Sequence, residues 1–466
     1  MEETPAVTDA PARPPAAPER EFGLPGETVR AVVEALDAGE PARVDELVRS
    51  LHYADLADLL EALDDEHRAR LIDQLGDRLD PECLHELDEP VRNQVVEQLG
   101  TFRVAKAIAR LDSDDALYVI EDLEEERRRQ VLQAMPAALR DLLEQGLSFP
   151  EESAGRLMQR EVAAVPSFWT VGQTIDFMRE SDDLPDDFYD LFVVDAKHRP
   201  IGTIPLNRLL RTKRPVKVSE IMRTPVHAVP VSTDQEAVAF LFRHHDLTSA
   251  PVVDDARRLI GVITVDDVVD VIEEEAEEDI MRLGGVMDEG FHARPFETVR
   301  RRQSWLVITL FNTIIASIVI SRFEAAIEQL VALAVLMPIV AAMGGNAGMQ
   351  VVTVVVRGLA TRELTSANTA RVVGRELLVG SMNGLVFGTI MATIAGLWFQ
   401  DLGLALVLAS AMIFNMVWAG FAGTMIPLAL SRFGIDPAVA AGPFLTTTTD
   451  VLGFFIFLGL ATVFLL

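Results

Sequence analysis

The pattern of apolar and polar positions divides the chain into three stretches. Residues from about 25 to 150 place apolar side chains at helical spacing, with charged residues between them. Residues 151–268 alternate short apolar runs with amphipathic helical segments. From residue 300 onward, apolar runs of about 20 residues or more follow one another, each long enough to cross the hydrocarbon core of a bilayer. The pattern therefore predicts several domains, the last of them in a membrane.

The first stretch repeats short helical units. ADLADLLEALDDEHRARLIDQL and DDALYVIEDLEEERRRQVLQAM share an acidic cap, leucines at helical spacing and a charged second helix. Such helices can bury their apolar stripes only against neighbours, which predicts an α-helical superhelix. Its surface acids, Asp114 among them, form either a sensing arm or ordinary caps and solvated faces. Residues 1–24 lack the pattern of a signal peptide, and we expect a disordered tail there.

The second stretch is an internal duplication. LMQREVAAVPSFWTVGQTIDFMRE matches IMRTPVHAVPVSTDQEAVAFLFRH, and FVVDAKHRPIGTIPLNRLL matches PVVDDARRLIGVITVDDVV. Each copy, 151–214 and 215–268, predicts a strand, a helix, two strands joined by a polar turn, and a helix. The pattern resembles a tandem pair of CBS domains, an α+β fold that often binds adenine nucleotides. The resemblance implies a nucleotide contact at Thr264 and Asp267, in a motif that the first copy lacks.

A strongly acidic segment, 269–299, leads from the duplication to the long apolar runs. Apolar residues recur along its helical part, and the other faces and the preceding turn hold the acids Asp267, Asp270, Glu274, Glu275, Glu278 and Asp279. Like charges four residues apart destabilise a helix by a few tenths of a kcal/mol per pair, which indicates a neutralising partner. Hard divalent cations, bound through carboxylates and water, would supply one. A solvated acidic connector is the alternative.

Five uncharged or nearly uncharged runs then follow, at 304–321, 329–356, 377–400, 402–431 and 437–466. Arginines precede the first run and lie between the second and third and between the fourth and fifth. The loops on the opposite side hold only Arg322, together with acids. By the positive-inside rule, the large N-terminal region lies in the cytoplasm and the C-terminus outside.

Charge and cysteine content narrow the range of partners. The formal net charge is -30, and residues 300–466 hold nine arginines against seven acids, so residues 1–299 carry -32. Such an acidic region is a poor partner for nucleic acid and a plausible partner for cations. The alternative is that the acids only keep the region soluble. Cys83 is the single cysteine, which excludes an intrachain disulfide and a thiolate metal site within one chain.

The fifth run contains a lone carboxylate, Asp450. An ionised group in hydrocarbon costs about 2.5 to 3.5 kcal/mol even on insertion scales, so it usually marks an ion path. Gly442 and a run of four threonines come shortly before it. In the second run, MPIVAAMGGNAGMQ places the polar Asn346 among glycines, which serve either helix contact or the lining of a cavity.

The order of a helical acidic region, a CBS pair, an acidic helix and five spans resembles the MgtE family of magnesium channels. The most specific motifs are PEESAGRLM, EEEAEEDIMRLGG, PIVAAMGGNAGMQ and DPAVAAGPFLTTTTDV. The resemblance implies a multidomain membrane protein with a cytosolic α-helical superhelix at 25–150, the tandem CBS domains, a connecting plug helix at 269–299 and a five-helix transmembrane domain at 300–466. It also implies a homodimer in the cell (inner) membrane that is not an enzyme, takes up Mg²⁺ and has no nucleic-acid partner.

The same resemblance implies roles for individual residues. Ion binding in the pore falls to Asp450, Thr446, Thr449, Gly442 and Asn346. Cytosolic Mg²⁺ would close the pore by binding to Asp267, Asp270, Glu275, Glu278, Asp279, Glu236, Asp246, Asp436 and Asp114. ATP would bind the second CBS copy through Thr264 and Asp267. A sodium-coupled carrier of divalent cations and a membrane-tethered nucleotide sensor without transport are the alternatives, and selectivity among Mg²⁺, Co²⁺, Mn²⁺ and Ca²⁺ is open.

Overall fold

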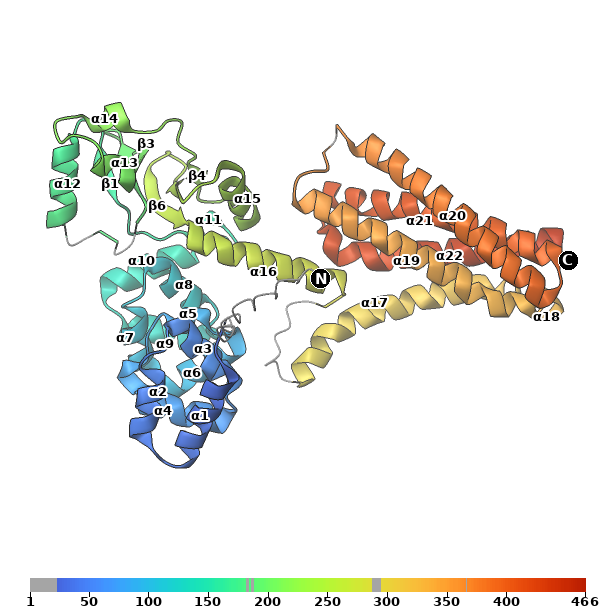
Figure 1. Ribbon diagram of the computed structural model, residues 1–466, viewed down its shortest axis with the longest axis horizontal. Coiled ribbons are helices and arrows are strands. Elements are labelled where there is room, and N and C mark those ends of the chain that lie inside the picture. Colours follow the sequence, from blue (N-terminus) through green and yellow to red (C-terminus); the bar gives the residue numbers. More distant parts are fainter. Residues whose placement is uncertain (1–22, 182–183, 186–187, 287–294, 366) are drawn as a thin grey trace, which may run out of the picture. The chain divides into compact units, whose positions relative to one another are not determined.

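The computed structural model describes residues 23–181, 184–185, 188–286, 295–365 and 367–466. Apart from its last two residues, the expected disordered tail lies outside them. The chain divides into two compact units, an N-terminal unit that ends at Val268 and a C-terminal unit that begins at Val269. The division falls inside one continuous helix, α16 (Val265–Leu283), which is coloured yellow-green in Figure 1.

The N-terminal unit begins with a stack of short helices, drawn in blue to cyan in Figure 1. They are α1 (Gly26–Asp37), α2 (Pro41–Val48), α3 (Tyr53–Ala62), α4 (Asp65–Leu75), α5 (Cys83–Glu86), α6 (Glu89–Leu99), α7 (Thr101–Ile108), α8 (Ser113–Glu121), α9 (Glu125–Ala134) and α10 (Ala137–Leu147), with a 3-10 turn at Gly76–Arg78. Their leucine, valine and isoleucine side chains form one continuous core. No helix in the stack is longer than three or four turns, so each depends on its neighbours for burial.

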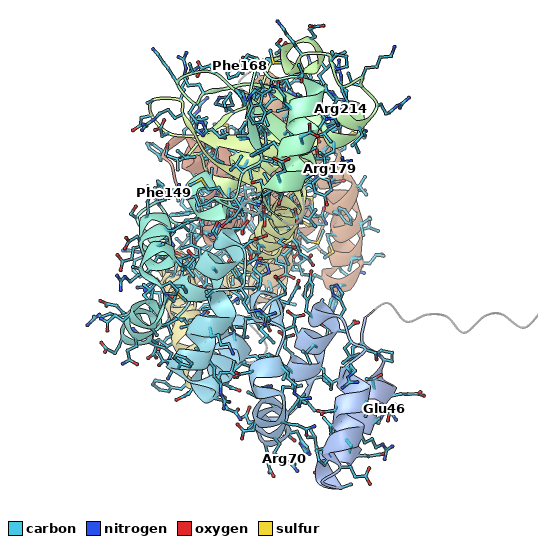
Figure 2. All side chains as sticks on the ribbon, turned by 90° about the vertical axis from the view of Figure 1, so that its left-hand side faces the viewer. Glu46, Arg70, Phe149, Phe168, Arg179 and Arg214 are labelled. Atoms are coloured by element: carbon cyan, nitrogen blue, oxygen red, sulfur yellow. The ribbon has the colours of Figure 1, made fainter. Side chains whose placement is uncertain are left out.

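A repeated arginine fixes the register of this stack. Arg68, Arg92 and Arg128 each donate to the backbone carbonyl seven residues earlier, at 3.5, 3.5 and 3.4 Å. Only 4% of Arg68 and 1% of Arg92 is exposed. A buried guanidinium is costly unless its N–H groups are bonded, so each bond ties a helix to the turn that precedes it. Arg70, labelled in Figure 2, makes a longer link by donating to the Leu36 carbonyl oxygen at 3.2 Å.

The rest of the N-terminal unit holds two three-stranded sheets of the same topology. The first contains β1 (Ala164–Pro166), β2 (Asp190–Val194) and β3 (Pro200–Pro205), and the second contains β4 (Val229–Pro230), β5 (Ser249–Val253) and β6 (Leu259–Thr264). The accompanying helices are α11 (Ala154–Leu157), α12 (Val171–Glu180), α13 (Leu206–Leu210), α14 (Val218–Ile221) and α15 (Gln235–His245). In each sheet the central strand pairs parallel to the first strand and antiparallel to the third.

The two copies contact each other in equivalent ways. A side chain on Gly202 would meet Met222 at 2.6 Å, and one on Gly261 would meet Met158 at 2.6 Å. Each glycine lies in the third strand of one copy, and each methionine lies in the segment that leads into the other copy. This reciprocal contact confirms the duplication that the sequence predicts.

The C-terminal unit consists mainly of long helices. They are α17 (Pro295–Ser321), α19 (Ala332–Ala360), α20 (Thr369–Phe399), α21 (Leu402–Arg432) and α22 (Pro437–Phe464), with a short α18 (Glu324–Gln329) before α19. These five long helices are the ones in the described residues that are long and apolar enough to cross a membrane. The second span was expected from residue 329, but Gln329 ends α18 and the long helix begins at Ala332.

Glycines bring α20 and α21 together at backbone distance. A Cβ atom on Gly380 would lie 2.6 Å from the Met416 carbonyl oxygen, and one on Gly384 would lie 2.9 Å from the Ile413 Cα atom. Gly388 continues the same row one turn further along, 3.1 Å from the Ala409 carbonyl oxygen by the same measure. Small residues four apart allow this approach, as is common between helices in membranes.

Candidate ion-binding sites

Asp450 lines a pocket of about 240 Å³ in the C-terminal unit. The other lining residues come from α17, α19, α22 and the end of α16: Leu283, Gly284, Trp305, Thr309, Asn312, Thr313, Met349, Gly442, Pro443, Thr446 and Thr447. Hydroxyl, amide and carboxylate oxygens thus meet in a space that is large enough for several waters. The arrangement provides hydrogen-bonding groups and one negative charge inside a bundle of apolar helices.

The expected pore residues separate into two groups. Asp450, Thr446 and Gly442 line the pocket. Thr449 is fully buried, and its hydroxyl donates to the carbonyl oxygens of Leu445 and Thr446 at 3.1 and 3.0 Å. Asn346 is exposed on α19 and does not line this pocket. Within one chain, therefore, three of the five expected residues share a site.

Sequence reasoning missed the contribution of α17. Thr309, Asn312 and Thr313 face the pocket from this helix, and Asn312 Nδ2 donates to the Pro443 carbonyl oxygen at 3.4 Å. The signal was present, because these polar residues lie three and four positions apart and so share one helical face. With Trp305 one turn earlier, they form a polar stripe inside an apolar run.

The glycines of α19 serve helix contact. A Cβ atom on Gly344 would lie 2.1 Å from the Asn415 amide nitrogen, and one on Gly348 would lie 2.8 Å from Leu445. Asn415, which is 1% exposed, donates from Nδ2 to the Val340 carbonyl oxygen at 2.9 Å. These contacts hold α19 against α21 and α22.

A first group of acids lies in the N-terminal unit, where the start of α16 meets α8. The charge of Asp267 raises the pKa values of both Asp114 and Asp115, which places the three carboxyl groups close together. Glu82 belongs to the same group, since its charge contributes to the raised pKa of Asp115. The structure therefore brings together Asp114 and Asp267, two of the residues expected to bind metal, with Asp115 and with Glu82, which was not expected.

Burial and mutual repulsion control the protonation of this group. Burial is the main cause that raises the pKa of Asp115 from 3.8 to about 8, followed by the charges of Glu82 and Asp267. Burial likewise raises the pKa of Asp114 well above its ordinary value, and Asp267 adds to the effect. Near neutral pH, these carboxyl groups either hold protons or need a cation.

A second group of acids lies at the C-terminal half of α16, in the C-terminal unit. The pKa of Asp279 is raised, first by burial and then by the charges of Asp436 and Glu275. Arg282 donates from Nη1 to Asp436 at 2.5 Å and also pairs with Glu278. Asp436 in turn accepts from the Ala438 backbone N–H at 2.8 Å, which caps the start of α22.

The other acids expected in the sensor lie elsewhere. Glu236 lies in the first turn of α15 and Asp246 follows its last residue, so about 15 Å of helix separates them. Asp270 is exposed on α16. In the described parts of the chain, no group of three or more His, Cys, Asp or Glu side chains has the spacing to hold a metal ion directly.

The expected nucleotide contacts lie against each other. Asp267 Oδ2 accepts from the hydroxyl and the backbone N–H of Thr264 at 2.8 and 3.3 Å. A cleft between the two sheets is lined in part by Thr264, but its volume is about 10 Å³, which suits about one water. Nucleotide binding at Thr264 and Asp267 stays a prediction.

Family models match most of the described chain. Residues 51–152 match the MgtE intracellular N domain, residues 154–214 and 218–274 match the CBS domain, and residues 337–460 match the MgtE divalent cation transporter. These matches, with the five long apolar helices, confirm the fold class that the sequence predicts.

Curated relatives cover nearly the whole chain. The magnesium transporter MgtE of Thermus thermophilus is 34% identical over 93% of this chain and 97% of its own length. The magnesium transporter MgtE of Bacillus subtilis is 30% identical over 94% of this chain and 98% of its own. Among solved structures, the cytosolic domain of the Mg²⁺ channel MgtE in complex with ATP is 30% identical and covers 52% of this chain and 99% of its own, with a TM-score of 0.49. The chain therefore belongs to the MgtE family of magnesium transporters.

Proposed function

We propose that this chain forms a Mg²⁺ channel whose ion pathway passes the carboxylate of Asp450. The observation that carries the proposal is the pocket itself, where Asp450 meets Thr309, Asn312 and Thr446 inside the membrane-spanning bundle. A carboxylate in this environment is expensive, and intramembrane carboxylates usually serve an ion or proton path.

The chemistry of the pocket suits a hydrated divalent cation. Mg²⁺ releases its waters reluctantly and prefers octahedral oxygen ligands. Threonine hydroxyls, the Asn312 amide and backbone carbonyls can hydrogen-bond the water shell, while Asp450 supplies charge without displacing water. One carboxylate offsets only half of the charge of Mg²⁺. The proposal therefore includes a homodimer, in which a twofold axis brings a second Asp450 to the ion.

Cytosolic Mg²⁺ closes this channel in the proposed mechanism. Leu283 and Gly284, at the end of α16, line the same pocket as Asp450, so a movement of α16 changes access to the carboxylate. Two groups of acids involve α16, one around Asp267 and one around Asp279, and within each group the carboxylates repel one another when no cation is bound. Mg²⁺ relieves this repulsion and favours the closed state, because it binds that state more tightly.

Topology follows from the loops. Arg300, Arg301 and Arg302 precede the hydrophobic part of α17, and the side of the bundle that they mark is cytoplasmic by the positive-inside rule. The proposal therefore places the N-terminal unit in the cytoplasm, the C-terminus outside and the bundle in the cell (inner) membrane. ATP is not part of it, and nucleotide binding at Thr264 and Asp267 stays a separate prediction.

The test is Mg²⁺ flux through the full chain in liposomes. Asp450→Asn keeps the size of the side chain and removes its charge, and we expect flux to fall by about a hundredfold or more, since the pathway loses its main cation ligand. Glu363→Gln removes an exposed acid from the loop after α19 and should leave flux unchanged. Flux that persists in Asp450→Asn would refute the pathway. Flux that requires a sodium gradient would favour the carrier.

A further inference from the structure

Arg282 is the only Lys or Arg between Arg258 and Arg294, in a segment that holds eleven acids. We propose that Arg282 is a positioning residue that latches the end of α16 to α22 without any metal. The proposal rests on the channel described above. It adds the positive charge of Arg282 to the Mg²⁺ that acts in the proposed gate.

The first support is the ion-pair geometry. Arg282 Nη1 lies 2.5 Å from Asp436 Oδ2, and the same guanidinium pairs with Glu278 one turn earlier on α16. The side chains of Arg282 and Asp436 are 27% and 33% exposed, so water screens the pair only in part. An Arg–carboxylate bond that is partly shielded is stronger than an exposed pair. The contact joins α16 to the first residue before α22, the helix that carries Asp450.

The second support is steric. Gly285 has a φ of +75°, and a Cβ atom there would lie 1.9 Å from Trp305 Nε1. The backbone just after α16 therefore rests directly on the Trp305 indole of α17, in a conformation that favours glycine. Leu283 and Gly284 lie between the two contacts in sequence, and both line the Asp450 pocket. The ion pair of Arg282 and the contact of Gly285 with Trp305 thus hold residues 282–285 in place from both ends.

The electrostatics explain why such a latch is needed. Glu278 and Asp436 contact Arg282 directly, and Glu275 and Asp279 lie on the same part of α16. Without a cation, these charges would drive α16 away from α22. Arg282 neutralises Asp436 and Glu278 and leaves Asp279 and Glu275 for Mg²⁺. The latch therefore keeps part of the population closed at low Mg²⁺ and lowers the concentration needed to close the rest.

The primary test does not depend on ion flux. The backbone N–H groups of Gly284, Gly285 and Val286 donate to carbonyls of α16, so their hydrogen exchange reports on the end of this helix. The exchange is measured on the full chain, reconstituted in nanodiscs without divalent cations. We expect Arg282→Gln to speed the hydrogen exchange of these amides by about tenfold, because the end of α16 loses its charged hydrogen bond to Asp436. Arg282→Lys should restore part of the protection. Arg300→Gln, which removes an exposed charge from α17, should leave it unchanged.

A double-mutant cycle tests the partner. In an Asp436→Asn background, Arg282→Gln should change the exchange rate little, because the bond is already lost. A full effect in that background, or no effect of Arg282→Gln in the wild-type chain, would overturn the latch. Gly285→Ala tests the steric contact separately and should speed exchange of the same amides while the ion pair is intact.

Current measurements connect the latch to gating. With Mg²⁺ titrated on the side of the N-terminal unit, Arg282→Gln should raise the half-inhibiting concentration by about fivefold, as expected for a partly screened ion pair. A fall in that concentration would mean that Arg282 competes with Mg²⁺, which contradicts the proposal. Absence of current in the wild-type chain would refute the channel and leave the exchange result to decide the latch.

Discussion

At the residue scale, the same carboxylate chemistry occurs in two settings. Asp450 lies alone among hydroxyl and amide groups, where it can attract a hydrated cation. Asp115 lies among other acids, and its pKa is raised to about 8 by burial and then by Glu82 and Asp267. A lone carboxylate attracts a passing cation. Crowded carboxylates repel one another, and a bound cation lowers this repulsion. The first arrangement suits a pathway and the second suits a sensor.

The raised pKa of Asp115 predicts a pH dependence. Its ordinary value is 3.8 and its folded value is about 8, so between these values the folded state holds a proton that the unfolded state has lost. Without divalent cations, stability should therefore fall as pH rises through this window. In the proposed sensor Mg²⁺ binds the ionised carboxylates, so its stabilising effect should be larger at about pH 9 than at about pH 6. The first calorimetric transition of the full chain measures both.

Two variants make this prediction specific. Asp115→Asn should raise the first transition temperature at high pH without Mg²⁺ and flatten its pH dependence, because the buried repulsion is removed. Asp58→Asn, on an exposed face of α3, should leave both unchanged. A pH dependence that survives Asp115→Asn in full would assign the effect to other groups.

At the scale of elements, small residues decide how the long helices meet. The row Gly380, Gly384 and Gly388 on α20 touches the backbone of α21, while Gly344 and Gly348 on α19 receive Asn415 and Leu445. In a membrane, contacts between helices depend on close approach and on polar groups, since apolar burial gives little advantage over lipid. These glycines therefore stabilise the bundle because the absence of a Cβ atom lets the helices approach closely.

One pair of substitutions on α20 separates contact from helix propensity. Gly384→Ala places a Cβ atom 2.9 Å from the Ile413 Cα atom, and we expect a loss of about 1 to 3 kcal/mol as α20 and α21 separate. Gly374→Ala, on the same helix with open space around it, should be neutral or stabilising by up to about 1 kcal/mol. Denaturant unfolding in micelles, followed by helical circular dichroism, gives both values. Equal effects would contradict the contact.

At the scale of the whole molecule, α16 belongs to both units. Its start brings Asp267 to Asp114 and Asp115 in the N-terminal unit, and its end brings Asp279 to Asp436 in the C-terminal unit. A continuous helix transmits a change at one end to the other more directly than a loop would. Cation binding at either group of acids would therefore favour one position of α16, which is the physical basis of the proposed gate.

Neutralising the acids of this gate should uncouple it from Mg²⁺. In the combined variant Glu275→Gln, Glu278→Gln and Asp279→Asn, the repulsion is lost together with the proposed cation ligands Glu275 and Asp279, and we expect cytosolic Mg²⁺ to inhibit the current at least about tenfold less effectively. The matched control Asp266→Asn, Glu273→Gln and Glu277→Gln removes the same charge from exposed positions of α16. Unchanged inhibition in the first variant, or equal loss in both, would contradict the sensor.

Local sequence signals predicted much of the architecture. Repeated caps and leucines indicated the helical stack, the duplicated segments indicated two equivalent sheets, and apolar runs indicated the five long helices. The lone charge of Asp450 marked a residue that lines a pocket among the long helices, because an isolated carboxylate in an apolar run is costly wherever its helix lies. Such features depend on period, length and charge along the chain, which the sequence carries by itself.

Long-range contacts were decided only by the tertiary structure. The sequence pairs Asp450 with the threonines before it, but the fold adds Thr309 and Asn312 from another helix and turns Thr449 away. The link between Arg282 and Asp436 spans 154 residues, and no local pattern predicts it. Such contacts depend on how helices approach, which here rests on glycine rows and a buried asparagine. The sequence by itself determined which groups carry the chemistry, and the fold decided which of them meet.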